Sequence, residues 1–407
     1  MSNPMRPFED VRAALLAAAT PVRDVESVPT AEALGRVLAI DQVSSLNVPP
    51  LDNSAMDGYA VHSGDVAAPG ARLTVAQRIP AGSVGHLLAR GTAARIFTGA
   101  PVPPGADAIV MQELCSLDGD GVTIDHVPRP GEWIRRAGED IRAGASVLVA
   151  GQRLQPQMLG LAASVGCATL PVFRRLRVAL FSTGDELVMP GEPLPPGAIY
   201  NSNRYVLRGL LEALGCQVSD LGIVPDSRDA TRAALRQAAA SNDLIVTSGG
   251  VSVGEEDHVR PAVLAEGRLD LWLVAMKPGK PVAFGHVNDP AGGPGAAFIG
   301  LPGNPVSSFV TFAMLVRPFV LRAMGVESCL PRTLPLVAGF DWTRPDRRRE
   351  FLRARIGDDG RVALFDNQGP GVLTSTVWAD GLVDNPPGQT IAAGDPVRFI
   401  PYSELLS

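Results

Sequence analysis

From Leu176 to about residue 326 the sequence alternates short apolar runs with amphipathic stretches, and this alternation constrains the fold more than any other feature. The apolar runs that predict strands are RVALF, QVSDLGIV, DLIVTSGG, LDLWLVAM, PVAFG and AAFIG. Helices are expected over residues 204–214, 229–241, 257–266 and 305–324. Strands that alternate with helices form parallel sheets covered on both faces. We therefore expect a doubly wound parallel α/β domain over residues 176–327.

The sequence on either side of this domain has a different residue pattern. Residues 46–145 consist of short β-rich runs broken by Gly and Pro, which predicts a small β domain. Residues 1–45 and 146–175 together predict an extended, helical linker domain, with helices over 7–19, 30–38 and about 155–167. Residues 328–407 contain short strands, turns and no strong helix, which predicts a C-terminal β domain.

Composition excludes several classes of protein. The net charge of −6 and the pI of about 5.5 argue against a general nucleic-acid binder. We find neither an apolar run of about 18 residues nor a signal-peptide pattern, so we expect no membrane span. The four cysteines are far apart and the five histidines form no HExxH motif, so we expect no structural transition-metal site. The cysteine pattern favours a reducing, cytoplasmic location.

Lysine is confined to one short string. Lys and Arg together number 36, yet Lys277 and Lys280 are the only lysines in the sequence. Both lie in KPGK, directly after the predicted strand LDLWLVAM. A lysine ammonium is a compact point charge that suits a phosphate or another oxyanion. Taken alone, the pair could equally be a solvated loop.

The residues that follow the predicted strands are expected at one sheet edge, because the carboxyl ends of parallel strands lie at the same edge. Ligands of such sheets bind there. The residues expected to bind substrate there are Thr183, Gly184, Asp185, Ser248, Gly249, Gly250, Ser252, Gly254, Pro302, Gly303 and Asn304. The same edge carries charged side chains, namely Glu186, Asp226, Asp257, Lys277 and Lys280.

This combination points to a phosphorylated substrate. Glycine-rich turns and helix N-termini offer backbone N–H groups to anionic oxygens. Carboxylates beside phosphates repel them unless a hard cation such as Mg²⁺ lies between. We therefore expect Mg²⁺ and group-transfer chemistry, although each part alone could be a strand exit, a helix cap or a solvated loop. Neither a GxxxxGK[ST] nor a GxGxxG motif occurs, which disfavours ordinary NTPases and nicotinamide enzymes.

Further strings outside the α/β domain contain candidate site residues. PPLDNSAMDGYAV contains Asp57, RIFTGAPVPPGADAIV contains Thr98, and RRAGEDI contains Asp140. By composition alone these are turns. In the C-terminal domain, the run RRREF includes Arg348 and is either a solvated face or an anion site. Ser375 has a hydroxyl that could donate to an anion, or could belong to an ordinary strand or turn.

These strings, taken in order, resemble the molybdopterin molybdenumtransferases, the family of MoeA and the gephyrin E domain. The strings that carry the resemblance are PPLDNSAMDGYA, RIFTGAPVPPGADAIV, GED, FSTGDEL, TSGGVSVGEEDH, KPGKPVAFG and LPGNPVSS. The match runs from about residue 8 to residue 400. The SGG-containing domain alone also resembles molybdopterin adenylyltransferases and competence-damage-type proteins. The C-terminal string NQGPGVLTSTVWADGL departs most from the family pattern.

The resemblance implies an activity, a fold and a site. The family inserts molybdate into adenylylated molybdopterin and releases AMP, with Mg²⁺ or a similar ion. Its chains are elongated, have four parts and form homodimers, with the cleft between the α/β domain of one subunit and the small domains of its partner. The implied catalytic residues are Asp57, Thr98, Asp140, Glu186, Lys277 and Lys280, and the implied metal ligands are Glu186, Asp226 and Asp257. Arg348 and Ser375 are expected to bind substrate.

Three alternatives stay open at this point. A tungsten-specific paralogue would use the same residues. A non-catalytic scaffold would use the fold to display a partner surface. A bare adenylyltransferase is disfavoured, because the chain is longer than one such domain needs. A molybdopterin adenylyltransferase and recipient molybdoenzymes are expected as further partners, and nucleic acids and membranes are not.

Overall fold

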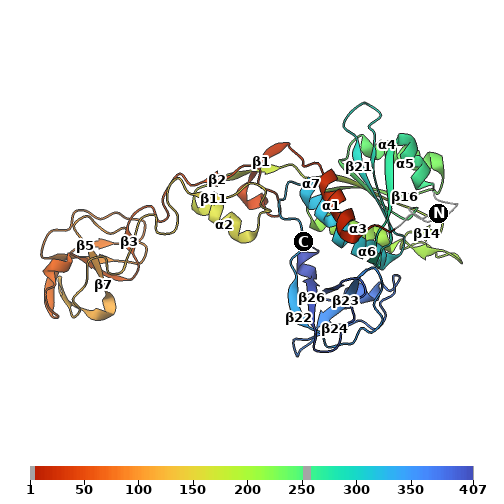
Figure 1. Cartoon of the computed structure of the whole chain (residues 1–407). Helices are drawn as coiled ribbons and strands as arrows, with labels where there is room; N and C mark the ends of the chain where they lie inside the picture. Colours follow the sequence, from red (N-terminus) through yellow and green to blue (C-terminus); the bar gives the residue numbers. More distant parts are fainter. Residues whose placement is uncertain (1–4, 251–257, 407) are drawn as a thin grey trace.

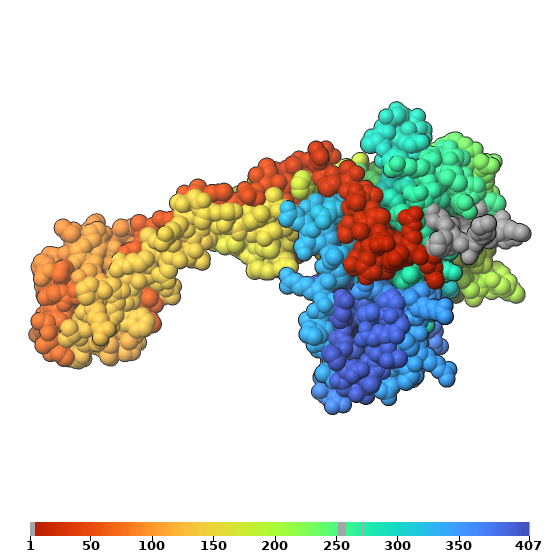
Figure 2. Space-filling view, viewed as in Figure 1, coloured from red at the N-terminus to blue at the C-terminus, as the bar shows by residue number. Residues whose placement is uncertain are grey.

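The computed structural model describes residues 5–250 and 258–406. The molecule is elongated (Figure 1, Figure 2). A small β domain occupies one end, a narrow linker follows, and the α/β domain and the C-terminal β domain lie together at the other end. The N-terminal helix α1 (Phe8–Ala18) packs against the α/β domain, which lies more than 150 residues further along the chain.

The α/β domain is built on a six-stranded sheet with the strand order β16-β13-β17-β21-β20-β18. The strands are β13 (Arg177–Thr183), β16 (Gln217–Val224), β17 (Leu244–Ser248), β18 (Gly267–Leu273), β20 (Pro281–Val287) and β21 (Ala296–Leu301). The four neighbouring strands β16, β13, β17 and β21 pair in parallel, which confirms the expected fold class. A short parallel pair, β14 (Leu187–Val188) and β15 (Ile199–Tyr200), projects beside this sheet.

One strand runs against the expectation of a wholly parallel sheet. β20 pairs antiparallel with both β18 and β21. The chain reaches β20 from β18 through the KPGK turn, in which the Val274 N–H donates to the Lys280 carbonyl. A connection this short cannot carry the chain back to the start of a parallel strand, which needs a crossover of a dozen or more residues.

Helices cover both faces of the sheet because its strands are apolar on both sides. Along β13, Val178 and Leu180 belong to one buried cluster, and Ala179 and Phe181 belong to the other. The helices on the first face are α1, α3 (Ser202–Ala213), α6 (Pro305–Thr311) and α7 (Arg317–Ala323). Those on the second face are α4 (Arg228–Ala239) and α5 (Val259–Glu266).

The last helix of this domain is long and apolar. α6 and α7 are joined by a π-helical turn over Phe312–Val316, so the helical segment runs from Pro305 to Ala323. By length and composition alone this segment could cross a membrane, but 94% of its most apolar window is buried inside the structure. It is therefore the central core helix of the α/β domain, packed against the sheet.

The small β domain contains a six-stranded sheet with the order β7-β4-β6-β5-β9-β8. Its strands are β4 (Gly58–Val61), β5 (Ala71–Ile79), β6 (Thr92–Ile96), β7 (Ala108–Met111), β8 (Cys115–Asp118) and β9 (Gly121–Ile124). A short pair, β3 (Asn53–Ser54) with β10 (Ile134–Arg135), lies next to it. The β-rich runs of residues 46–145 thus form one six-stranded sheet and one short strand pair.

The linker consists of two short antiparallel ribbons and one helix. Its elements are β1 (Val25–Pro29), β2 (Gln42–Val43), β11 (Ser146–Leu148), α2 (Pro156–Ser164) and β12 (Thr169–Phe173). The helix expected over residues 30–38 is wrong, since only Thr30–Glu32 form a single 3₁₀ turn. Gly35 has a φ of +72°, and Val37 and Leu38 form bridges with Arg153 and Val172, so the chain is extended there.

The C-terminal sheet has the order β19-β23-β25-β26-β22, with β24 also paired to β23. Its strands are β19 (Met276–Lys277), β22 (Leu334–Val337), β23 (Arg349–Ile356), β24 (Val362–Leu364), β25 (Gly381–Asn385) and β26 (Pro396–Pro401). The edge strand β19 comes from the α/β domain and contains the first lysine of KPGK. A short helix, α8 (Thr374–Trp378), was not expected from the sequence.

Candidate functional site

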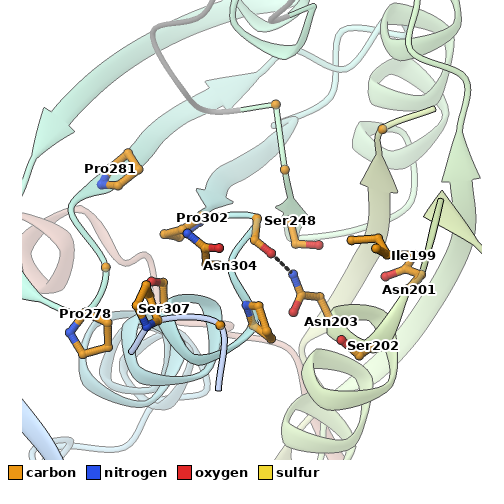
Figure 3. Close-up of a pocket in the computed structure, with 18 of the residues that line it drawn as sticks. Ile199, Asn201, Ser202, Asn203, Ser248, Pro278, Pro281, Pro302, Asn304 and Ser307 are labelled. Carbon is orange, nitrogen blue, oxygen red and sulfur yellow. Dashed lines mark hydrogen bonds between the residues drawn. The ribbon is translucent and has the colours of Figure 1, made fainter. Parts of the chain in front are cut away.

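A cavity of about 1030 Å³ lies where the carboxyl edge of the α/β sheet meets the C-terminal domain. Figure 3 shows the residues that converge on it from the strand ends and from the first turns of α3 and α6. The predicted site residues that line it are Thr183, Gly184, Glu186, Asp226, Ser248, Gly249, Gly250, Lys277, Lys280, Pro302, Gly303, Asn304 and Arg348. The structure thus brings most of the predicted sheet-edge residues into one cavity.

The glycines after β17 occupy conformations and space that a side chain would not fit. Gly249 has a φ of +89° and Gly250 a φ of +63°. A Cβ on Gly249 would lie 2.7 Å from the carbonyl oxygen of Thr183, and one on Gly250 would lie 2.4 Å from a methyl of Val259. Both positions therefore require glycine, and the backbone of this turn forms part of the cavity wall.

Two asparagines at the start of α3 line the cavity and were not predicted as site residues. Asn201 caps α3, since its Oδ1 accepts from the Arg204 N–H at 3.2 Å. Asn203 donates from Nδ2 to the carbonyl oxygen of Gly303 at 2.7 Å, which joins the start of α3 to the turn before α6 (Figure 3). The sequence signals a helix cap at this position, but not that two helix N-termini face the same cavity.

The cationic side chains at the cavity differ in their surroundings. Lys277 Nζ lies 3.1 Å from an oxygen of Glu350 and 3.5 Å from an oxygen of Asp346. Arg348 donates to both oxygens of Asp346, at 2.9 and 2.8 Å. Lys280 is exposed and makes no ion pair with any residue in the described parts of the chain. Among the described residues, no carboxylate therefore offsets the charge of Lys280 at the cavity.

The ion pairs shift the titration of this cluster. The two hydrogen bonds from the Arg348 guanidinium, supported by the nearby Lys277 ammonium, hold the pKa of Asp346 well below its ordinary value. The same contacts raise the pKa of Arg348. Asp346 and Arg348 are therefore both ionised at neutral pH, and their charges offset one another.

Carboxylates line the opposite part of the cavity. Glu186 follows β13 and Asp226 follows β16, the neighbouring strand. Asp185 does not line the cavity, and its Oδ1 accepts from the Asp226 N–H at 3.4 Å. Glu186 and Asp226 supply hard oxygen donors of the kind that Mg²⁺ prefers. Within residues 5–250 and 258–406, no group of three or more His, Cys, Asp or Glu side chains is placed to hold a metal ion.

Some predicted residues lie elsewhere or outside the described parts. Ser252, Gly254 and Asp257 lie outside the described residues. Ser375 was expected to bind substrate, but it is fully buried and does not line the cavity. Its hydroxyl donates to the Val372 carbonyl at 2.6 Å and lies 3.2 Å from the Arg353 Nε donor, so it is occupied within the C-terminal domain.

The structure brings Asp57 and Thr98 together in the small β domain. They lie beside the paired strands β4 and β6, and one Asp57 oxygen accepts from both the N–H and the hydroxyl of Thr98. These bonds hold the pKa of Asp57 below its ordinary value, the backbone N–H having the largest effect. Asp140 belongs to the same domain, where its N–H donates to the Val48 carbonyl.

These three residues do not reach the cavity of their own chain. The small β domain lies at the far end of the molecule, with the linker between it and the cavity (Figure 1). Sequence order alone could not have established this separation, because the length and direction of the linker depend on how its two ribbons pair.

Three family models together match nearly the whole chain. They are the MoeA N-terminal region (domain I and II) at residues 6–166, the probable molybdopterin binding domain at residues 179–322, and the MoeA C-terminal region (domain IV) at residues 335–402. The first model ends in the linker, before β12, the second runs from β13 to α7, and the third begins in β22 of the C-terminal domain.

Similar proteins carry the same family name. A molybdopterin molybdenumtransferase of Haemophilus influenzae is 39% identical over 383 residues, which is 92% of this chain and 93% of that protein. Molybdopterin molybdenumtransferase 2 of Mycobacterium tuberculosis is 41% identical over 374 residues, which is 88% of this chain and 90% of that protein. A crystal structure of a molybdopterin biosynthesis moeA protein from Pyrococcus horikoshii superposes with a TM-score of 0.84 at 27% identity, covering 98% of this chain and all of that one. The chain therefore belongs to the MoeA family of molybdopterin molybdenumtransferases.

Proposed function

We propose that this protein inserts molybdenum from molybdate into adenylylated molybdopterin and releases AMP. The observation that carries the proposal is the single cavity that combines a glycine-rich turn, two helix N-termini, three cationic side chains and two carboxylates. The names of the relatives, which are molybdopterin molybdenumtransferases, support the same activity.

The backbone and amide groups of the cavity suit the phosphate part of the substrate. The turn at Gly249 and Gly250 and the starts of α3 and α6 present N–H groups and positive helix ends to anionic oxygens. Asn203 and Gly303 hold the two helix starts together. These groups would bind and orient the pyrophosphate that joins the pterin to AMP.

Glu186 and Asp226 are the residues that would hold Mg²⁺, with Asp257 as an expected third ligand. The ion, when bound, would offset the charge that develops on phosphate as the P–O bond to AMP breaks. Without such an ion, these two carboxylates would repel the pyrophosphate that the N–H groups attract.

Molybdate is a dianion and needs fixed cations. Lys280 has no ion pair in the described chain and is the side chain best placed to attract it from solution. Lys277 and Arg348 already face carboxylates, so they hold the oxyanion by position more than by net charge. Substrate and oxyanion would then meet at the wall formed by the KPGK loop.

We further propose that the protein works as a homodimer in which Asp57, Thr98 and Asp140 of one subunit close the cavity of the other. The position of these residues at the far end of their own chain supports this arrangement (Figure 1). Apolar side chains exposed along the linker also favour a covered surface, among them Leu34, Ile40 and Val43, each more than half exposed.

Two rival functions make different predictions. A tungsten-specific enzyme would prefer tungstate when both oxyanions compete, and the molybdenum named in the relatives' function disfavours it. A non-catalytic scaffold would bind a partner at the cavity and release no AMP, and the presence of Lys277, Lys280, Glu186 and Asp226 at one cavity disfavours it. All four cysteines are free thiols, which suits the reducing cytoplasm where we place the reaction.

The decisive experiment is an AMP-release assay with purified protein and adenylylated molybdopterin. We expect AMP release that depends on both molybdate and Mg²⁺. AMP release that is independent of molybdate would overturn the transferase proposal. Consumption of ATP with free molybdopterin would instead identify an adenylyltransferase.

A further inference from the structure

A buried carboxylate of the C-terminal domain lies behind the first lysine of the KPGK loop. Glu350, in β23, has no exposed surface. One of its oxygens faces Lys277 Nζ at 3.1 Å. The other accepts from Trp342 Nε1 at 2.8 Å and from the Asp346 N–H at 3.1 Å, with Asn385 Nδ2 at 3.4 Å. Glu350 is therefore fixed by neutral donors from its own domain, and its cationic partner comes from the other domain.

The backbone holds Lys277 in the same place. β19 pairs in parallel with β23, with Met276 opposite Arg349 and Lys277 opposite Glu350. The strand that enters the KPGK loop is thereby an edge strand of the C-terminal sheet. Because both the backbone and the ammonium of Lys277 are attached to β23, any movement of the C-terminal domain moves one wall of the cavity.

The charges explain why this contact matters for an anion site. A buried carboxylate keeps its charge only with a partner, and losing one member of such a pair is strongly unfavourable. Lys277 is partly exposed to the cavity on one side and faces Glu350 on the other. A flexible lysine would otherwise lose side-chain entropy on binding an anion, whereas a fixed ammonium has already lost it.

We propose that Glu350 is a positioning residue for the oxyanion site, acting through Lys277. It holds the Lys277 ammonium at the cavity wall, in the place where negative charge is stabilised during transfer. The C-terminal domain, whose sequence departs most from the family pattern, thereby contributes to the chemistry without touching the substrate. The inference rests on the proposed function and assigns Glu350 a role in that same site.

The first test concerns the pair itself and needs no substrate. Glu350→Gln and Lys277→Met should each lower the melting temperature of the full-length protein. If the two side chains stabilise each other, the double variant melts close to the less stable single variant. Melting losses that simply add would show that the two side chains are independent and would overturn the proposal.

The second test separates positioning from stability. In the AMP-release assay, Glu350→Gln should lower kcat by roughly tenfold or more while the KM for molybdate changes by no more than about twofold, because the ammonium keeps its charge but loses its fixed position. The matched control is Asp384→Asn. Asp384 is also buried in the same sheet, but its cationic partner Arg349 does not line the cavity, whereas Lys277, the partner of Glu350, does. This control should have a lower melting temperature than the unaltered protein and an unchanged kcat.

A milder variant covers the case in which Glu350→Gln does not fold. Trp342→Phe removes one hydrogen bond to Glu350 and keeps both charges. It should lower kcat less than Glu350→Gln does and leave the KM for molybdate unchanged. A normal kcat in every variant that folds, or a kcat that falls equally in Asp384→Asn, would overturn the positioning role. If the unaltered protein releases no AMP at all, the proposed function fails, while the melting comparison still reports on the pair.

Discussion

Thr98 donates both its N–H and its hydroxyl to one oxygen of Asp57, at 2.8 and 2.7 Å. The two residues are 41 positions apart in the sequence, and the pairing of β4 with β6 brings them together. Since these bonds lower the pKa of Asp57, its carboxylate is ionised at neutral pH. In the proposed reaction Asp57 would therefore serve as a fixed negative charge or a hydrogen-bond acceptor, and not as a proton donor.

Replacing Asp57 by alanine should leave the fold intact, because the side chain is not buried in its own domain, and should lower AMP release by roughly tenfold or more if Asp57 acts on the partner's cavity as proposed. Thermal melting and AMP release measure the two effects separately. Thr98→Val, which keeps the backbone N–H and loses the hydroxyl, should raise the pKa of Asp57 toward its ordinary value. Turnover by Asp57→Ala at the unaltered rate would contradict the assigned role.

Mixing two impaired variants, assayed at molybdate concentrations well below the KM, tests whether the cavity is completed by a partner. If Asp57 acts on the partner's cavity, a dimer of one Asp57→Ala chain and one Lys280→Ala chain contains one intact site. Random reassortment of equal amounts should then restore about a quarter of the full AMP-release activity. If verified chain exchange leaves the mixture no more active than the two variants alone, Asp57 and Lys280 belong to the same site of one chain, or to none.

The two lysines should respond differently to substitution. Lys280→Ala should raise the KM for molybdate by roughly tenfold, because Lys280 is the cavity cation without an ion pair in the described chain. Lys277→Ala should mainly lower kcat and the melting temperature, because it also leaves Glu350 without its cation. Arginine at either position keeps the charge and changes the shape. Full activity of both arginine variants would show that the compact ammonium is not required.

The contact between Asp346 and Arg348 predicts a pH dependence of stability. The pKa of Asp346 is lowered in the folded protein, so its stabilising contribution is present above the ordinary carboxyl pKa of about 4 and is lost as the pH falls below it. Arg348→Met should remove ~1–3 kcal/mol at pH 7 and less at pH 3. Urea unfolding at the two pH values measures the difference. An equal loss at both would contradict the ion-pair account.

Much of the site could be predicted because it depends on a simple rule about sheets. Gly249, Asp226 and Lys280 are far apart in the sequence, but each follows a predicted strand, and parallel strands end at one edge. The antiparallel direction of β20 does not disturb this edge, since β20 begins there after the KPGK turn. The helix over residues 305–324 follows from an equally local signal, its long apolar run.

The remaining features depend on contacts between distant segments. Nothing near Glu350 in the sequence signals that it lies behind Lys277, because the run RRREF has the composition of a solvated face. Nothing near Ser375 in the sequence signals that its hydroxyl is already hydrogen-bonded to a backbone carbonyl and to Arg353. Gln368 also lines the cavity, and its side chain is held by the backbone of Arg353 in β23 and by the Phe365 carbonyl. Such roles follow from tertiary contacts, which sequence periodicity does not encode.

Alanine at Gly249 should damage the cavity more than the same change at a comparable glycine. Gly249 and Gly222 both have a positive φ, at +89° and +75°. A Cβ on Gly222 meets no atom within 4 Å, whereas a Cβ on Gly249 would lie 2.7 Å from a backbone oxygen that cannot move aside. Gly222→Ala should therefore cost only the backbone strain of ~1 kcal/mol. Gly249→Ala adds a displacement of the turn toward Thr183, so it should cost more stability and should also raise the KM for adenylylated molybdopterin. Equal melting temperatures and equal KM values for the two variants would show that the turn tolerates a side chain and that its backbone does not shape the phosphate site.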